Sequence, residues 1–370
     1  MVSRVQLTVY DKSFTKIGPV GDVDVAIVLR HMAVGTLRFV LPASHRRFPA
    51  LVARGSRVVA TLDGVHVMSG HVTEMSGEAT GAWDSVWEFT VSDDIAEILA
   101  LRGLPDPANP VTAQTKDYDR RSGPAETVFK DAVAANAAAF GIPLTCAPSQ
   151  GRGLHVDASW RFHRILDRID LGSLGVTVRQ SGTGLVADVY QTQARTQVLG
   201  PGVIPEWQSV ITAPETTRVL AGAQGDGAAR VIRAVTSPGD ESAWGMVRVA
   251  WMDARDLDTL TPEQSAEMTN RMRKELREGR AALATKVALQ ESDAFRWRHN
   301  YNLGDSVRLR LSPHVGVIED SITEIRVRTV GDGVAITPIV GDISVLDPYV
   351  RSARKLHSMT ARMTQIETGK

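Results

Sequence analysis

Apolar and polar residues alternate along the first hundred residues of the chain. The alternating runs lie at residues 5–9, 23–29, 37–41 and 86–91. A period of two residues predicts half-buried antiparallel strands. The dipeptide Asp63-Gly64 stands between two apolar runs and predicts a tight hairpin turn. We therefore expect residues 1–102 to form a first β-domain, built as a small barrel or a sandwich.

The pattern changes in the middle of the chain. Residues 103–124 are rich in proline and glycine and have no periodicity, which predicts a linker or a long loop. The alanine-rich run 125–140 predicts a helix, and apolar spacing from about residue 159 predicts a second one. Two alternating runs within residues 176–189 predict a hairpin. We interpret residues 125–215 as an α/β insertion.

Strand patterns return after the insertion, interrupted by one long helix. Residues 216–260 form a strand-rich connecting region in this interpretation. Thr261-Pro262 is a favourable helix start, because threonine caps the helix and proline occupies its first position. The helix is expected over residues 261–290. Residues 291–346 alternate again and predict a second β-barrel-like domain.

Residues 347–370 predict a C-terminal helix. Its apolar residues follow spacings of three, four and three, which is the pattern of a coiled-coil seam. The expected oligomer contacts are Leu356, Met359, Met363 and Ile366. The alternatives are a helix packed on its own domain and a frayed tail.

Two short segments of the first β-domain recur in the last one. Gly55–Ala60 corresponds to Gly304–Leu309, and His71–Met75 corresponds to Ser321–Ile325, with Thr-Glu between apolar residues in both. The two matches keep the same separation along the chain to within one residue, as expected for an internal duplication. The predicted fold class is α+β, mostly β. It comprises two related small β-barrel domains separated by an α/β insertion and a long helix, with a C-terminal helix.

Composition narrows the range of functions. Of 370 residues, 43% are hydrophobic and 23% are charged, which is typical of a folded protein of more than one domain. The 42 basic and 42 acidic residues cancel, so the basic surface of a nucleic-acid-binding protein is not expected. The single cysteine, Cys146, excludes an intrachain disulfide, and we expect a buried or half-buried thiol. Neither a signal peptide nor an 18-residue apolar run is present, which indicates cytoplasmic synthesis without a membrane span.

Motifs for catalysis are absent from the sequence. It has no P-loop, no His-Glu-x-x-His, no EF-hand loop and no Gly-x-Ser-x-Gly nucleophile elbow. The nine histidines are dispersed, and the pairs Asp93-Asp94 and Glu319-Asp320 are expected to be solvated or to cap elements. We therefore predict no catalytic residue, no metal site and no cofactor.

Two rival functions need features that the sequence does not display. A cell-wall hydrolase needs two carboxylates or a metal across a cleft. A carbohydrate-binding receptor module needs aromatic side chains on one exposed face, and Trp83, Trp87 and Trp297 are the candidates.

The order of these elements resembles a known family. The segments Asp63-Gly64, Ser69–Glu74, Tyr301–Val307 and Gly333–Gly341 stand in the order found in the tail-hub proteins of siphophages. The chain is most similar in this respect to the minor tail proteins of phages that infect actinobacteria. The resemblance spans about residues 1–345.

The resemblance implies a structural protein rather than an enzyme. In that family two barrels per chain let a homotrimer present six barrels, which matches a sixfold tail tube. It implies a place at the virion tail tip, after synthesis in the host cytoplasm, with the distal tail ring, tape measure and tip or fibre proteins as partners. It also allows transient contact with DNA that passes through the lumen. Helices 125–140 and 261–289 are our candidate surfaces between subunits.

Overall fold

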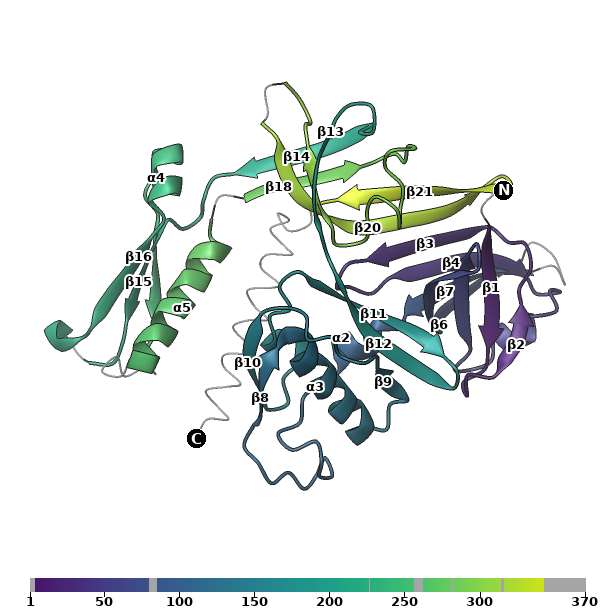
Figure 1. Cartoon of the computed structure of the whole chain (residues 1–370), viewed down its shortest axis with the longest axis horizontal. Coiled ribbons are helices and arrows are strands. Elements are labelled where there is room, and N and C mark those ends of the chain that lie inside the picture. The colour runs from purple at the N-terminus through teal and green to yellow at the C-terminus, as the bar shows by residue number, and fades with distance from the viewer. Residues whose placement is uncertain are drawn as a thin grey trace. The chain divides into compact units, whose positions relative to one another are not determined.

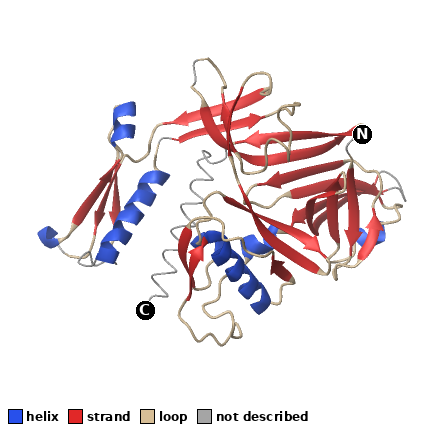
Figure 2. Cartoon of the chain, viewed as in Figure 1, coloured by secondary structure: helices blue, strands red, loops and turns tan. Residues whose placement is uncertain are grey.

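The computed structural model describes residues 4–79, 85–225, 227–255, 262–280, 282–313 and 316–342. The described chain divides into two compact units (Figure 1). Unit 1 contains the residues up to Glu206 together with Val287–Gly341, and unit 2 contains Trp207–Lys286. Strands predominate and helices are few (Figure 2), which confirms the α+β, mostly β prediction.

Five strands of the N-terminal region form a first block in the order β3-β4-β7-β6-β5. Their bounds are β3 Val25–Arg30, β4 Thr36–Pro42, β7 Ser85–Asp93, β6 Val65–Ala79 and β5 Arg57–Leu62. Burial alternates along β3 and β4 because successive side chains point to opposite faces of the sheet. The predicted hairpin turn is confirmed, since Asp63 and Gly64 have φ angles of 51° and 80°, as a type I′ turn requires.

A second block has the order β14-β18-β21-β20, with β19 on the remaining edge of β20. Its strands are β14 Glu206–Thr212, β18 Ala282–Ala288, β21 Gly333–Val340, β20 Ile318–Val330 and β19 Ser306–Leu309. The sheet is extended by β1 Val5–Tyr10 and β2 Lys16–Pro19 beside β5, and by β13 Ala194–Leu199 beside β19. The short helix α1 (Phe48–Leu51) lies between β4 and β5 of the first block along the chain.

The two blocks are joined through one sheet and one core. β3 of the first block pairs with β20 of the second, and one hydrophobic core contains residues from both. Among the described strands the order is open at both ends, so closed barrels are not confirmed. Strand periodicity predicts which face of a strand is buried but not which edge meets another strand.

The internal repeat is confirmed in the strand register. In the first block Arg57 lies opposite His71, and in the second Ser306 lies opposite Ser321, which are the corresponding positions of the two repeats. A register shift follows at the same place in both blocks, after Val72 in β6 and after Ile322 in β20. The matched segments therefore form the same hairpin with the same irregularity.

The insertion packs around its own core. Its elements are α2 Ile95–Ala100, β8 Asp119–Pro124, α3 Ala125–Ala139, β9 Leu144–Cys146, β10 His155–Trp160, a 3₁₀ turn at Ile165–Arg168, β11 Leu174–Ser181 and β12 Gly184–Gln191. The predicted helix near 125–140 and the predicted hairpin are confirmed as α3 and β11–β12. The prediction of a second helix from residue 159 is wrong. Phe162 adopts a φ of 61°, which no helix interior permits, so the apolar spacing that follows belongs to the 3₁₀ turn.

Residues 103–118 form a long loop without helix or strand, one of the two predicted alternatives, whereas the prediction is wrong for residues 119–124. Leu104 is buried, and its N–H donates to the side-chain oxygen of Asn136. Residues 119–124 form β8, which pairs along its length with β10. Between them, Asp106 accepts hydrogen bonds from Asn109, Thr115 and Lys116. Polar side chains thus order a segment whose proline and glycine content suggests a flexible one.

Unit 2 has a three-stranded sheet with α5 (Pro262–Glu278) packed on one face. Its other elements are β15 Arg218–Gly222, β16 Ile232–Thr236, β17 Val249–Asp253, α4 Pro238–Trp244 and a 3₁₀ turn at Gly227–Ala229. The long helix is shorter than the predicted 261–290, because Gly279 ends it. The carbonyl of Gly279 accepts hydrogen bonds from Glu215 and Thr216, and the chain continues into β18. The predicted C-terminal helix lies outside the described residues.

Candidate assembly interface

The joint between the two blocks is built on β20, which has different partners along its length. Residues 318–321 pair with β19, whereas residues 324–328 lie between β21 and β3. In this second part Glu324 lies opposite Arg30, and Val327 lies opposite Ile27, in antiparallel register. We call the pairing of β3 residues 26–30 with β20 residues 324–328 the intrachain seam.

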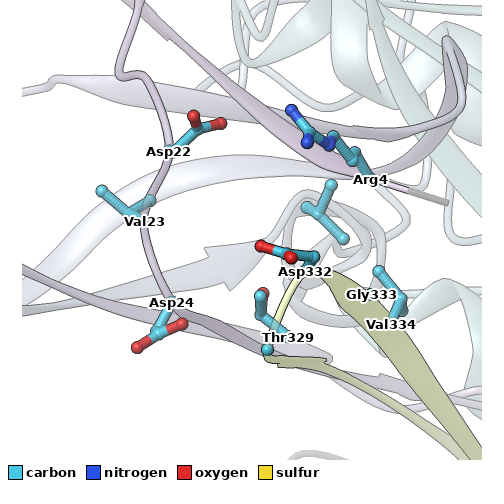
Figure 3. A pocket seen from close by; sticks show the side chains of 10 residues that line it. Arg4, Asp22, Val23, Asp24, Thr329, Asp332, Gly333 and Val334 are labelled. Carbon is cyan, nitrogen blue, oxygen red and sulfur yellow. The ribbon is translucent and has the colours of Figure 1, made fainter. Parts of the chain in front are cut away.

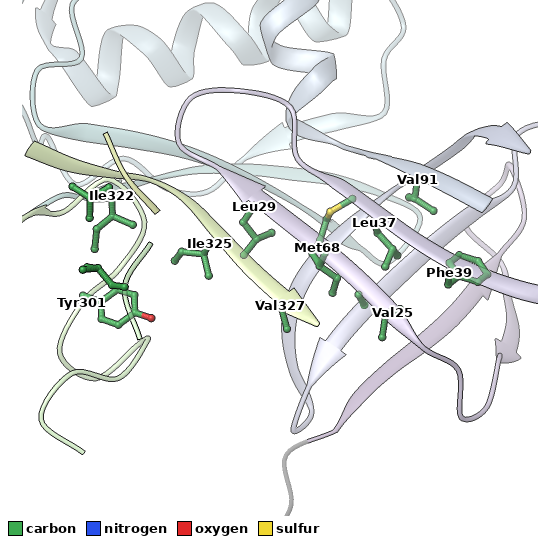
Figure 4. Packing of buried hydrophobic residues seen from close by; sticks show 14 of the residues in the cluster. Val25, Leu29, Leu37, Phe39, Met68, Val91, Tyr301, Ile322, Ile325 and Val327 are labelled. Atoms are coloured by element: carbon green, nitrogen blue, oxygen red, sulfur yellow. The ribbon is translucent and has the colours of Figure 1, made fainter. Parts of the chain in front are cut away.

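The intrachain seam is closed by apolar side chains. Ile27, Ile325 and Val327 are completely buried, and Leu29 is 8% exposed. Figure 4 shows the seam residues Leu29, Ile325 and Val327 within the shared core. Burying an aliphatic side chain of this size contributes about 1.5–3 kcal/mol. The seam therefore holds the two blocks together by main-chain pairing and by hydrophobic packing.

Polar contacts at one end of the seam fix its register. Arg30 Nε donates to Glu324 Oε2 at 3.2 Å, and Arg30 Nη1 donates to the carbonyl oxygen of Val34 at 2.9 Å. The Arg30 side chain is 38% exposed, so the ion pair adds at most about 1 kcal/mol. Its main effect is geometric, because a shifted register would separate the two charges.

A pocket of about 280 Å³ lies at the opposite end of the seam. Figure 3 shows Asp22 and Asp24, which precede β3, together with Asp332 from the β20–β21 turn and Arg4. Nearby, the Val25 N–H donates to Thr329 Oγ1 at 3.2 Å and fastens the start of β3 to β20. Three aspartates and one arginine line the pocket, so acidic side chains are in excess at this end of the seam. In the part of the chain that the structure describes, no group of three or more His, Cys, Asp or Glu side chains could hold a metal ion.

A buried ion pair joins the first block to the insertion. Arg57 Nη2 donates to the Asp94 carboxylate at 2.6 Å, and both side chains are completely buried. Ser69 Oγ donates to Asp94 Oδ2, and Arg57 Nε donates to Gln180 Oε1 of β11 at 2.9 Å. The expectation that Asp94 is solvated or caps a helix is therefore wrong. Asp93 fills that role through Oδ1, which accepts a hydrogen bond from the Ile95 N–H.

Burial lowers the pKa values of four histidines of unit 1, His31, His66, His71 and His163, and so favours their neutral forms. His66 shows the largest of these shifts, to a pKa of about 4, and its Nε2 is buried without a hydrogen-bond partner within the described structure. His71 Nε2 lies 2.7 Å from Nη1 of Arg57, the arginine of the buried ion pair. His31 contacts the Tyr190 hydroxyl, 3.0 Å from its Nδ1.

The pKa of His66 predicts a pH dependence of stability. The unfolded chain takes up a proton near pH 6.5, whereas the folded state resists protonation down to a pH of about 4. Above pH 6.5, protonation of His66 therefore has no effect on the free energy of unfolding. Below pH 6.5 the free energy of unfolding decreases, by up to about 1.4 kcal/mol per pH unit, because the unfolded chain binds the proton and the folded chain does not. His66→Gln should remove this component, measured as the difference from the unsubstituted protein in urea unfolding at pH 7.5, 6 and 5. His155→Gln, at an exposed position, is the control. A parallel pH dependence of His66→Gln and the unsubstituted protein would contradict the assignment.

The predicted oligomer contacts are four apolar side chains of the C-terminal segment. Leu356, Met359, Met363 and Ile366 lie outside the described residues. The two helices expected between subunits use their apolar faces inside the chain. Val128, Phe129 and Val133 of α3 are buried in the insertion core, and Met268 and Met272 of α5 are buried against the sheet of unit 2.

Of the three tryptophans that are candidates for a carbohydrate platform, the two that the structure describes are not on an exposed face. Trp87 and Trp297 are half-buried and pack against the shared core, and Trp83 lies outside the described residues. Arg298 covers the Trp297 ring at 4.3 Å from its centroid.

Cys146 is half-buried as predicted, and burial raises the pKa of its thiol to about 11, so it is not an activated nucleophile.

Unit 2 presents an exposed apolar surface on the sheet face opposite α5. Ile232, Val249 and Trp251 share this face and are 58%, 57% and 53% exposed. The Arg230 guanidinium lies over the Trp251 ring, 5.2 Å from its centroid. We call these four residues the open face of unit 2. Contiguous exposed apolar side chains on a folded protein are typical of protein-binding surfaces.

None of the described helices has both the length and the hydropathy that a membrane span needs.

Comparisons with known proteins identify relatives of this architecture. The sequence matches the siphovirus ReqiPepy6 Gp37-like protein family over residues 6–342. No curated protein sequence matches the chain.

Solved structures share the fold at low sequence identity. The 43 kDa tail protein of prophage MuSo2 from Shewanella oneidensis is 12% identical with a TM-score of 0.56, and the match covers 92% of this chain and 99% of that one. The prophage tail protein gp18 from Listeria monocytogenes is 14% identical with a TM-score of 0.54, covering 95% and 99% of the two chains. A tail protein from Neisseria meningitidis is 11% identical with a TM-score of 0.53, covering 92% and 97%. The fold is therefore that of phage tail proteins, and the chain belongs to the siphovirus ReqiPepy6 Gp37-like family.

Proposed function

We propose that this chain is a structural hub at the tip of a siphophage tail and acts as a homotrimer. The observation that carries the proposal is the duplication of one β-hairpin unit, in the same register, within a single chain. Three chains with two equivalent blocks each supply six similar surfaces, which matches a sixfold tube to a threefold tip. The shared tail-protein fold supports a place in the virion tail.

The partners follow from this position. One end of the ring would contact the distal tail ring, and the other would contact the tape measure and the tip or fibre proteins. The open face of unit 2 is our candidate surface for one of these proteins, because an interface of ordinary size needs exposed apolar side chains at its centre. DNA leaving the capsid would pass through the lumen, in transient contact with the wall. The role is mechanical and connecting, without a catalytic step.

The oligomeric mass tests this function. Light scattering on the purified full-length chain should give three times the mass of one chain. The mass should stay constant on dilution through the micromolar range, because obligate interfaces bury large areas. A species of one chain mass at every concentration would contradict the hub.

A further inference from the structure

The two blocks differ at one edge. In the second block, residues 324–328 of β20 are covered on one side by β21 and on the other by β3. The corresponding residues of the first block are 74–78 of β6, and β7 covers one of their edges. Their other edge extends beyond the end of β5, which stops opposite His71. Within the described residues, no strand pairs with this edge.

Exposure confirms that the edge is open. Residues 73–78 are exposed without interruption, including Met75, which is 38% exposed. Met75 corresponds to Ile325, which is completely buried under β3. An extended edge with free main-chain groups and an apolar side chain is a template for pairing with another strand.

The same chain carries the strand that fits this edge. Position by position, the block order β14-β18-β21-β20-β19 corresponds to β3-β4-β7-β6-β5, so β14 is the counterpart of β3. β3 is paired on both edges, with β4 and with β20, whereas β14 stands at the end of the sheet order and pairs with β18 alone among the described strands. Trp207 and Ile211 of β14 are 43% and 61% exposed.

We propose that β14 of one copy of this chain pairs antiparallel with residues 74–78 of β6 in the next copy and so repeats the intrachain seam between subunits. The inference rests on the proposed function, and it names the partner and the strands. Each copy offers one β14 edge and one β6 edge, which makes the contact heterologous, and a heterologous contact forms a ring when the rotation closes. With two equivalent seams per chain, three copies give six blocks joined by six seams.

A charge at the open edge tests the seam between subunits. Met75→Asp places a carboxylate where the intrachain seam has Ile325, and its cost to the isolated chain is small because Met75 is partly exposed. The mass measured by light scattering should fall from three chain masses to one. Val40→Asp is the matched control, since Val40 is 48% exposed on β4, a strand that takes no part in the proposed seam, and it should leave the mass unchanged. Circular dichroism and the urea midpoint establish that both variants are folded.

Cross-linking gives a second measurement that does not depend on the folding of Met75→Asp. In a Cys146→Ala background, Met75→Cys is combined in turn with a cysteine at each position from 207 to 211 of β14. At least one combination should form a disulfide between chains on mild oxidation and give covalent dimers and trimers on a denaturing gel. Met75→Cys alone should give neither species.

Failure of the seam and failure of the hub give different results. A trimer that resists Met75→Asp and forms no Met75→Cys cross-link would overturn the seam and leave the hub in place. A chain that stays monomeric would overturn the hub. Cross-linked products that stop at the dimer would overturn the ring arrangement of the seam.

Discussion

Replacing Arg57 with alanine should lower the free energy of unfolding of unit 1 by about 3–5 kcal/mol, because it leaves the Asp94 carboxylate buried without its charged partner. The ion pair is completely buried at 2.6 Å, so water cannot replace the lost contact. The substitution also removes the hydrogen bond to Gln180, which connects the first block with the insertion. Urea unfolding at pH 7.5, followed by circular dichroism, measures the loss.

Arg30→Ala is the matched control for this prediction. Arg30 also pairs with a carboxylate, that of Glu324, but the Arg30 side chain is 38% exposed, and Glu324 keeps an ion pair with Arg326 after the change. We expect a loss of about 1 kcal/mol or less. Equal losses for Arg57→Ala and Arg30→Ala would show that the buried pair does not carry the stability assigned to it.

Replacing Ile325 with alanine should lower the free energy of unfolding by about 2–5 kcal/mol, because it opens a cavity in the completely buried centre of the intrachain seam. The duplication supplies its own control, Met75→Ala at the corresponding position of the first block. At concentrations where the chain is monomeric, that change should cost less than about 1 kcal/mol, since Met75 has no strand across its open edge. A similar loss of the free energy of unfolding for Ile325→Ala and Met75→Ala would mean that the edge of β6 is covered in solution as the edge of β20 is.

Much of the strand content could be predicted from the sequence, because period-two alternation and turn chemistry are local. Asp63-Gly64 adopts the turn expected of that dipeptide, and the hairpin of β11 and β12 occupies the predicted residues. The internal repeat could also be predicted from the sequence, because Thr73-Glu74 and Thr323-Glu324 match and stand at the register shift in both blocks. These features depend on residues close to one another in the chain.

The remaining features depend on contacts between distant residues. Asp94 follows Ser92-Asp93 at a helix start, which is typical of a cap, and nothing nearby indicates that Arg57 of another strand neutralises it. The pairing of β3 with β20 joins residues almost at opposite ends of the described chain. The alternation of apolar and polar residues predicts which face of a strand is buried, but not which strand pairs with its edge. Ala282–Ala288 has helix-forming residues, yet it becomes β18 because strand partners are available after Gly279 ends the helix.

Averaged electron-microscope images of the purified full-length chain test the central claim most directly. We predict particles with threefold symmetry, a central hole and six similar lobes around it, two from each chain. Particles with three lobes, with twofold symmetry or without a central hole would contradict a ring in which each chain supplies two equivalent blocks.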